Sequence, residues 1–207
     1  MTKRILFASF WVLFFGIFIL LIIPGHRYLI DGFPEHLGKK TIFDKSIFTI
    51  HIISGIIVYI TGVMQFTPSL RNKNISLHRK IGIIYIVASL FCIIALYAML
   101  RTTLCPGCQA SQYAATTFWL LFIVLAYYFI RQRKIQLHQR MMISSFICAA
   151  YFVTVRVIDR LAMGLFRTLF ETEHAQFFAS DISAWAVPLV IFHLYWIMTS
   201  TRKPSTV

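Results

Sequence analysis

The chain has 207 residues, of which 58% are hydrophobic and only 13% are charged, and its mean hydropathy is +0.75. Soluble domains carry roughly 25% charged residues, so this composition excludes an ordinary soluble protein. It indicates an integral membrane protein with no room for a second, soluble domain. The formal net charge of +13 would suggest nucleic-acid binding in a soluble chain. Here the positions of the basic residues explain the charge as a topology signal, and we expect no nucleic-acid partner.

Six apolar segments are long enough, or nearly long enough, to cross a bilayer as helices, which takes about 20 mostly apolar residues. The predicted helices occupy residues 5–23, 47–66, 82–100, 115–130, 141–160 and 183–199. The first segment follows two basic residues, as a signal peptide does, but its apolar run is longer than a signal core of roughly 7 to 15 residues. We therefore predict an all-α, polytopic membrane bundle of six transmembrane helices, forming a single domain over residues 1–207.

Lysines and arginines are unevenly distributed between the segments that connect these helices. One set of connections, together with both termini, carries twelve of the 20 basic residues and no acid, whereas all seven acids fall in the other set. An excess of Lys and Arg marks the cytoplasmic side of a membrane protein. We therefore expect a multi-pass protein of a bacterial cytoplasmic (inner) membrane, surrounded by the lipid bilayer, with N and C termini in the cytoplasm.

The predicted helix 47–66 carries a histidine about one turn from its outer end, at a depth of roughly 6 Å for a rise of 1.5 Å per residue. Residues that recur every three or four positions share one helix face, and here they are His51, Gly55, Tyr59 and Gly62. A flat macrocycle and a neighbouring helix would fit equally well against this face. Gln65 marks the cytoplasmic end of the helix.

Two basic turns lead into helices through a similar histidine-containing step. His78 precedes the helix 82–100, and His138 precedes the helix 141–160. Aligning SLHRKIGIIY with QLHQRMMISS superposes the two histidines, and it also superposes Lys80 on Arg140. This similarity predicts a repeated local geometry that places both imidazoles near the cytoplasmic interface.

Cys105 and Cys108 form a Cys-Pro-Gly-Cys sequence in the predicted outer loop before the helix 115–130. Three interpretations remain open on the outer side of a bacterial membrane, which is oxidising. The pair is a local disulfide that tightens the loop, a redox-active dithiol or a transient copper site. A single pair of this kind is not evidence for a structural zinc ion.

Ionisable residues also occur in the last two predicted helices. Arg156 and Asp159 are three residues apart, so the two side chains can pair on one helix face. An arginine within a membrane span marks a functional site, whereas an arginine near a helix end reaches back to the surface; both interpretations fit Arg156. His193 lies at mid-depth or below in the helix 183–199.

Three explanations fit the four helical histidines. Paired histidines on facing helices can hold the iron of haem b axially, or another metal, and His78 with His138 is the best pair because both are predicted at the same depth. His51 would then need an outer partner, and His193 is the helical candidate that remains. A second explanation is a quinone or proton site at the outer face. It would be formed by His51, Arg156 and Asp159. The third is that His78 and His138 cap helices and bind lipid head groups.

With these residues in view, the chain resembles the family of predicted bacterial membrane proteins catalogued as a domain of unknown function, series number 2306. The resemblance covers residues 47–160 and rests on His51, Gly55, Gly62, Gln65, Phe66, Arg71, Leu77, His78, Arg79, Gly82, Tyr85, His138, Arg140, Met141 and Met142, with Arg156 downstream. Gln139 departs from the pattern, in which a second basic residue is expected after the histidine. The family name itself implies no activity.

The chain is also loosely similar to two-haem b-type transmembrane cytochromes, whose helical bundle carries paired histidines. The predicted helix 115–130 lacks the histidine that such a four-helix core would supply. The comparison therefore implies one haem, or none, rather than two.

Our leading hypothesis is a redox-linked protein of electron transport that binds haem b through His78 and His138, with a second centre near His51. The competing hypotheses are a non-catalytic membrane subunit or assembly factor of a larger complex and a quinone- or proton-handling protein. They imply another membrane protein or a quinone as partner. We assign no catalytic residue.

Overall fold

The computed structural model describes Gly16 and residues 41–101, 105 and 107–200. The predicted helix over residues 5–23 therefore falls outside the described residues, Gly16 excepted. The chain divides into two compact units, residues 1–49 and 50–207. All regular structure in the described part is helical, which confirms the all-α prediction.

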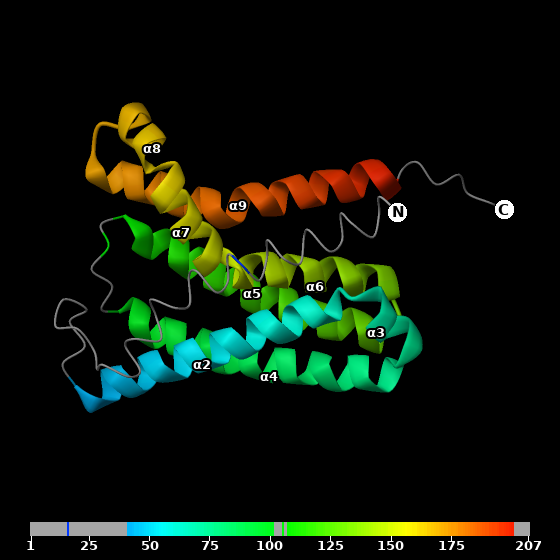
Figure 1. Ribbon diagram of the computed structural model, residues 1–207. Helices are drawn as coiled ribbons and strands as arrows, with labels where there is room; N and C mark the ends of the chain where they lie inside the picture. The colour runs from blue at the N-terminus through cyan, green and yellow to red at the C-terminus, as the bar shows by residue number, and fades with distance from the viewer. Residues whose placement is uncertain (1–15, 17–40, 102–104, 106, 201–207) are drawn as a thin grey trace. The chain divides into compact units, whose positions relative to one another are not determined.

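Eight helices follow one another along residues 42–200 (Figure 1). They are α2 (Ile42–Gln65), α3 (Pro68–Lys73), α4 (Ile75–Leu100), α5 (Cys108–Arg131), α6 (Ile135–Ala149), α7 (Tyr151–Leu161), α8 (Met163–Leu169) and α9 (Glu173–Ser200). By length and composition, α2, α4, α5 and α9 can each cross a membrane, and α6 with α7 provides a fifth candidate if the bent pair counts as one span. The described residues thus contain four or five candidate spans, and the prediction of six is not confirmed.

Several helices begin earlier than their apolar runs predict. The predicted helix 82–100 is α4 and starts at Ile75, where the side chain of Asn74 accepts a hydrogen bond from the Leu77 amide at 2.9 Å. Such an N-cap satisfies one of the free amides of the first turn. The difference is largest in α9, which begins at Glu173 instead of residue 183. Polar first turns do not register in a count of apolar residues, although they are fully helical.

The predicted helix 141–160 is wrong as a single straight element. It consists of α6 and α7, which meet at Ala150 with a bend of 47°. Helix kinks usually occur at proline, at glycine or where a side chain interrupts the ladder. Neither proline nor glycine lies at this break, so the local sequence gave no signal of it.

In the first unit, the described residues form the start of α2. The Thr41 hydroxyl lies 2.7 Å from the Asp44 carboxylate and accepts a hydrogen bond from the Asp44 amide at 3.1 Å. The Asp44 carboxylate in turn faces the Thr41 amide at 3.4 Å. This reciprocal arrangement is a capping box, and it fixes where the helix begins.

In the second unit, α5 packs against α4, α6 and α9. The buried core around it combines large aromatic residues with small residues and cysteines: Val58, Tyr85, Ala88, Cys92, Ile93, Trp119, Phe122, Ile123, Ala126, Met141, Cys148 and Ala149. Small side chains let membrane helices approach closely. The buried Tyr85 hydroxyl lies 2.9 Å from the Ser145 hydroxyl and links α4 to α6. The core therefore joins the helices that carry the candidate residues.

Gly62 is a tight contact between α2 and α6. A Cβ atom at this position would lie 2.5 Å from the Phe146 ring and 3.0 Å from Tyr85. Phe146 has little freedom to move away, because its ring also packs against Phe66 at 5.2 Å between centroids. At Gly55 of the same helix, the nearest atom would be the Cys92 sulfur at 3.9 Å, an ordinary contact.

We predict that Gly62→Ala lowers the free energy of unfolding relative to Gly55→Ala by about 1–3 kcal/mol, the usual cost of overpacking a core. Both substitutions give α2 the same gain in helix propensity, so the difference between them isolates the clash with Phe146. Unfolding of the purified protein in mixed micelles with increasing SDS measures it. Equal stability of the two variants would show that Phe146 can shift freely.

Candidate functional site

His138 lies in the first turn of α6 and is fixed by the backbone of α5. Its Nδ1 atom is 2.9 Å from the Ala126 carbonyl oxygen. Because a carbonyl can only accept, Nδ1 carries the proton, and the lone pair of a neutral imidazole is then on Nε2. Metal-binding histidines are commonly oriented by this kind of second hydrogen bond.

His78 lies in the first turn of α4 and is half-buried. Its Nδ1 atom is buried and has no hydrogen-bond partner among the described residues. His138, Arg71 and Arg79 all act on it electrostatically. The structure therefore brings the two histidines within electrostatic range of one another at one end of the second unit, and cationic side chains surround them.

Gln65 connects the end of α2 to the same place. Its side-chain amide donates a hydrogen bond to the His78 carbonyl oxygen at 3.0 Å. Gly82, one turn beyond, packs next to this amide, and a Cβ atom there would lie 3.6 Å from the Gln65 oxygen, an ordinary contact. Gln65, which the sequence marks only as a helix end, thus holds the first turn of α4 in position.

His193 of α9 lies at the same end of the second unit as His78 and His138, and it contacts α6. Arg140 donates hydrogen bonds to its Nδ1 atom, at 2.6 Å from one terminal guanidinium nitrogen and 3.1 Å from Nε, and the Ser144 hydroxyl lies 3.0 Å from its Nε2. Ser144 in turn donates to the Arg140 carbonyl at 2.9 Å. Every donor in this cluster can therefore be assigned. Arg140 donates to Nδ1 of His193, Nε2–H of His193 donates to the Ser144 hydroxyl, and Ser144 donates to the Arg140 carbonyl. Both ring nitrogens of His193 therefore have protein partners.

His51 lies elsewhere in the second unit. Its Nδ1 atom is 3.4 Å from the Cys92 sulfur. Cys92 follows His78 by fourteen residues along α4, which corresponds to about 21 Å at 1.5 Å per residue. His51 is thus distant from the His78 end, and His193 does not join it, because Arg140 and Ser144 hold that ring at α6.

Among the described residues, no group of three or more histidine, cysteine, aspartate or glutamate side chains is placed to hold a metal ion. His78 and His138 supply two imidazoles. Two protein ligands are enough for a metal ion whose remaining ligands come from a cofactor.

Arg156 and Asp159 lie on α7 and are exposed. The Arg156 guanidinium lies 6.0 Å above the Phe152 ring and donates a long hydrogen bond of 3.4 Å to the Phe152 carbonyl. Asp159 is within electrostatic range of both Arg156 and Asp181. The exposure of Arg156 fits a side chain that reaches outward from the helix rather than one that lines a cavity.

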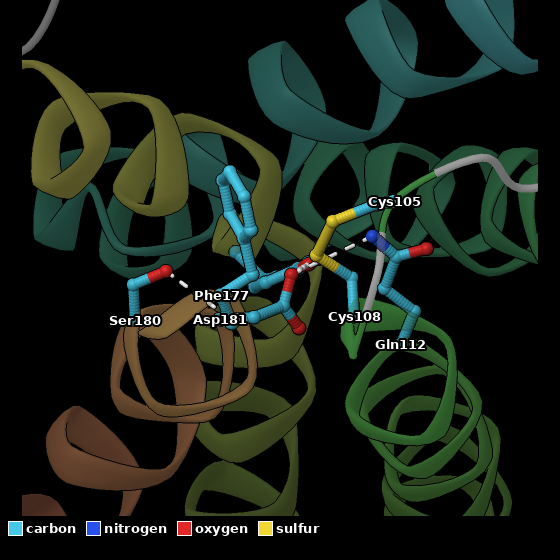
Figure 2. Close-up of a disulfide and its surroundings, with 7 residues drawn as sticks. Cys105, Cys108, Gln112, Phe177, Ser180 and Asp181 are labelled. Carbon is cyan, nitrogen blue, oxygen red and sulfur yellow. Dashed lines mark hydrogen bonds between the residues drawn. A yellow bond between two sulfur atoms is a disulfide. The ribbon is translucent and has the colours of Figure 1, made fainter. Parts of the chain in front are cut away.

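The two loop cysteines, Cys105 and Cys108, form a disulfide with their Cα atoms 5.5 Å apart. A disulfide is expected from the first of the three interpretations, and it is equally the oxidised form of the second, the redox-active dithiol. Figure 2 shows that the disulfide is surrounded by residues of α5 and α9, among them Gln112, Phe177 and Asp181.

Asp181 is the residue that sequence reasoning missed. The predicted helix 183–199 leaves this residue in the preceding outer loop, whereas in the structure it lies inside α9 and is 1% exposed. The Tyr151 hydroxyl donates a short hydrogen bond to Oδ1, and Gln112 approaches the same oxygen at 3.5 Å. The signal available in the sequence was the spacing of Asp181 and Trp185, which are one helical turn apart and so share a helix face. Both residues are buried in the structure.

We predict that Arg140 and His193 are energetically coupled. In a double-mutant cycle of Arg140→Ala and His193→Ala, the coupling free energy should be about 0.5–1.7 kcal/mol, the range for polar contacts between membrane helices. Unfolding in SDS-containing mixed micelles measures it. Tyr195→Ala on the same helix is the control, because Tyr195 is 65% exposed and should show no coupling to Arg140. A value near zero for both pairs would mean that the Arg140–His193 contact does not persist in micelles.

Comparison with known proteins identifies the family. No curated protein and no solved structure matches the chain. The model of a family described as predicted membrane protein (DUF2306) matches residues 48–197, well over half of the 207 residues. The matched region contains all eight helices except the first turns of α2 and the end of α9, and with them every residue of the cluster around His78 and His138. The chain is therefore an integral membrane protein of the predicted membrane protein (DUF2306) family.

Proposed function

We propose that the protein is redox-linked and binds one haem b through His78 and His138. The observation that carries this proposal is the pair itself. Two imidazoles from α4 and α6 lie within electrostatic range of each other, one with its Nδ1 tied to a backbone carbonyl and the other with a buried Nδ1 that lacks a partner. Buried polar groups without partners are rare and call for an explanation.

The protonation of His138 fits axial ligation. The Ala126 carbonyl holds the proton on Nδ1, so the lone pair on Nε2 is available to the iron. The backbone contact also fixes the direction of the ring. Gln65 holds the backbone of His78 from the other side. The ring of His138 and the backbone of His78 are thus held by residues of neighbouring helices.

The charges around the pair fit the chemistry of haem b, which carries two anionic propionates. Arg71 and Arg79 both act on His78, and guanidinium groups pair well with carboxylates. When bound, haem b supplies one-electron transfer, with a potential set by its axial ligands and surroundings. The role of the chain would be to hold the group in an apolar bundle and to neutralise its propionates.

One haem is favoured over two. α5 contains no histidine, His193 has both ring nitrogens engaged by Arg140 and Ser144, and His51 has its Nδ1 next to Cys92. A second centre near His51 would therefore need a ligand other than His193 and α5. We therefore propose only the centre held by His78 and His138.

We predict that the full-length protein, purified from haem-replete cells, shows a Soret band and the sharp reduced α band of a six-coordinate, low-spin b-type haem. His78→Ala and His138→Ala should each remove the low-spin spectrum, because each deletes one axial ligand. Absorption spectra normalised to protein concentration measure the haem content.

His174→Ala is the matched control, since His174 is an exposed histidine of α9 and should leave the spectrum unchanged. If the wild-type protein is colourless and also takes up no haem during titration, the proposal is wrong. A colourless protein that co-purifies with stoichiometric partners would support the subunit or assembly-factor alternative instead.

A further inference from the structure

The disulfide of Cys105 and Cys108 is seated directly against the start of α9. Gly107, between the two cysteines, has a φ angle of +82°, in the left-handed region that favours glycine. A Cβ atom at this position would overlap the His174 carbonyl oxygen. The loop is therefore held close to α9 through a residue that has no side chain, and α5 begins immediately afterwards, at Cys108.

Asp181 lies on the face of α9 that meets the first turns of α5. Gln112, which approaches its carboxylate at 3.5 Å, follows Cys108 by four residues and so lies on the same face of α5. Side chains in a helix lean toward its N-terminus, so that of Asp181 is directed toward the level of Cys108. One turn further along, the indole of Trp185 donates a hydrogen bond to the Ser111 hydroxyl at 3.0 Å and closes the site below. Figure 2 shows the carboxylate among the side chains around the disulfide.

The carboxyl group of Asp181 is half satisfied. Oδ1 accepts the hydrogen bonds from Tyr151 and Gln112, whereas the buried Oδ2 has no hydrogen-bond partner within the described residues. A buried carboxylate without a paired cation is costly, and a proton on the free oxygen removes the charge. Tyr151 and Gln112 do not neutralise the negative charge of a carboxylate, because both are neutral donors and both bind only Oδ1. The free Oδ2 is thus the atom that can carry and release a proton.

The two sulfur atoms are not equivalent. Cys108 is 5% exposed and is the first residue of α5, whereas Cys105 is partly exposed. A helix N-terminus stabilises a thiolate, and the sulfur that leaves most readily is the one with the more stable thiolate. An incoming thiolate would therefore attack Cys105 and displace Cys108 toward the interior, where Asp181 lies.

We propose that the Cys105–Cys108 pair is a redox-active disulfide that exchanges with an external dithiol and that Asp181 is its proton donor and acceptor. The site is separate from the haem proposal. In the first step, a thiolate of the dithiol forms a bond to the Cys105 sulfur, and the Cys105–Cys108 bond breaks. The electron pair of the broken bond remains on the Cys108 sulfur, which then takes the proton from Oδ2 of Asp181.

The second step completes the exchange. The second thiol of the external dithiol loses its proton to solvent. The resulting thiolate attacks the first sulfur of the same dithiol, which is bonded to Cys105 in the mixed disulfide. The bond to Cys105 breaks, and Cys105 leaves as a thiolate that is protonated by water. Two electrons have then passed from the dithiol, now a disulfide, to the Cys105–Cys108 pair. In the reverse direction, Asp181 accepts the proton of Cys108.

We predict that Asp181→Asn slows the reduction of the disulfide by dithiothreitol about 100-fold or more at neutral pH, the lower end of the range for general acid–base catalysis. Reduction of the full-length protein in detergent is stopped with acid, and the denatured samples are labelled with a mass-tagged maleimide. Two labels mark the oxidised protein, because Cys92 and Cys148 are free, and four mark the reduced protein. Asp181→Glu should recover part of the rate. Glu171→Gln, at an exposed acid before α9, is the matched control and should reduce like the wild type.

The pH profile of the wild-type protein provides a second readout. After correction for the thiolate fraction of dithiothreitol, the rate should fall as pH rises through the titration of the donor, because only the protonated carboxyl can give a proton to Cys108. Tyr151 and Asp159 of α7 are the titratable groups that act on Asp181 from its neighbours, and Asp159→Asn should keep the fall. A flat corrected profile in the wild type, or an Asp181→Asn variant that is reduced at the wild-type rate at every pH, would overturn the proposal.

Discussion

A polar atom inside a bilayer must find its partner within the protein, because no water is available there. Many polar side chains in the described helices satisfy this constraint with a carbonyl of their own helix, as Ser54 and Thr116 do. Others bond across helices: His138 to the Ala126 carbonyl, Arg140 to His193, and Tyr151 to Asp181. Four buried side-chain atoms of the described residues have no such partner, namely His78 Nδ1, Ser89 Oγ, Trp119 Nε1 and Asp181 Oδ2. Two of these four belong to groups that exchange protons or bind metals, and each lies at one of the two proposed sites.

α5 is the helix that supports both sites. Near its end, the Ala126 carbonyl orients His138; near its start, Cys108 and Gln112 face Asp181. Its own sequence contains neither a histidine nor an acid, so it contributes a backbone carbonyl to one site and a sulfur and an amide group to the other. The absence of a histidine in this helix argues against a second haem. Its packing against α4, α6 and α9 nevertheless makes it the common support of the candidate ligands.

Local features of the sequence were enough for part of this picture. The helical class follows from composition, and the repeated turn before His78 and His138 predicts their common depth. The electrostatic effect of His138 on His78 shows that the two side chains lie near each other. The bonds of Arg140 and Ser144 to His193 join residues about fifty positions apart, and no local pattern specifies such a contact. Asp181 was missed for a related reason. A hydropathy count ends a membrane helix at the first polar turn, and the burial of a carboxylate there depends on which helix lies opposite.

The spacing of the two sites along α5 determines how their proposals relate. Gln112 and Ala126 are fourteen residues apart, which is about 21 Å along a straight helix. Side chains separated by more than 7–10 Å without shared partners act independently to a good approximation. A substitution at Asp181 should therefore leave the imidazole pair unchanged, and one at His78 or His138 should leave the disulfide unchanged. The haem spectrum and the rate of disulfide reduction consequently report on different ends of the same bundle, and either proposal can fail without affecting the other.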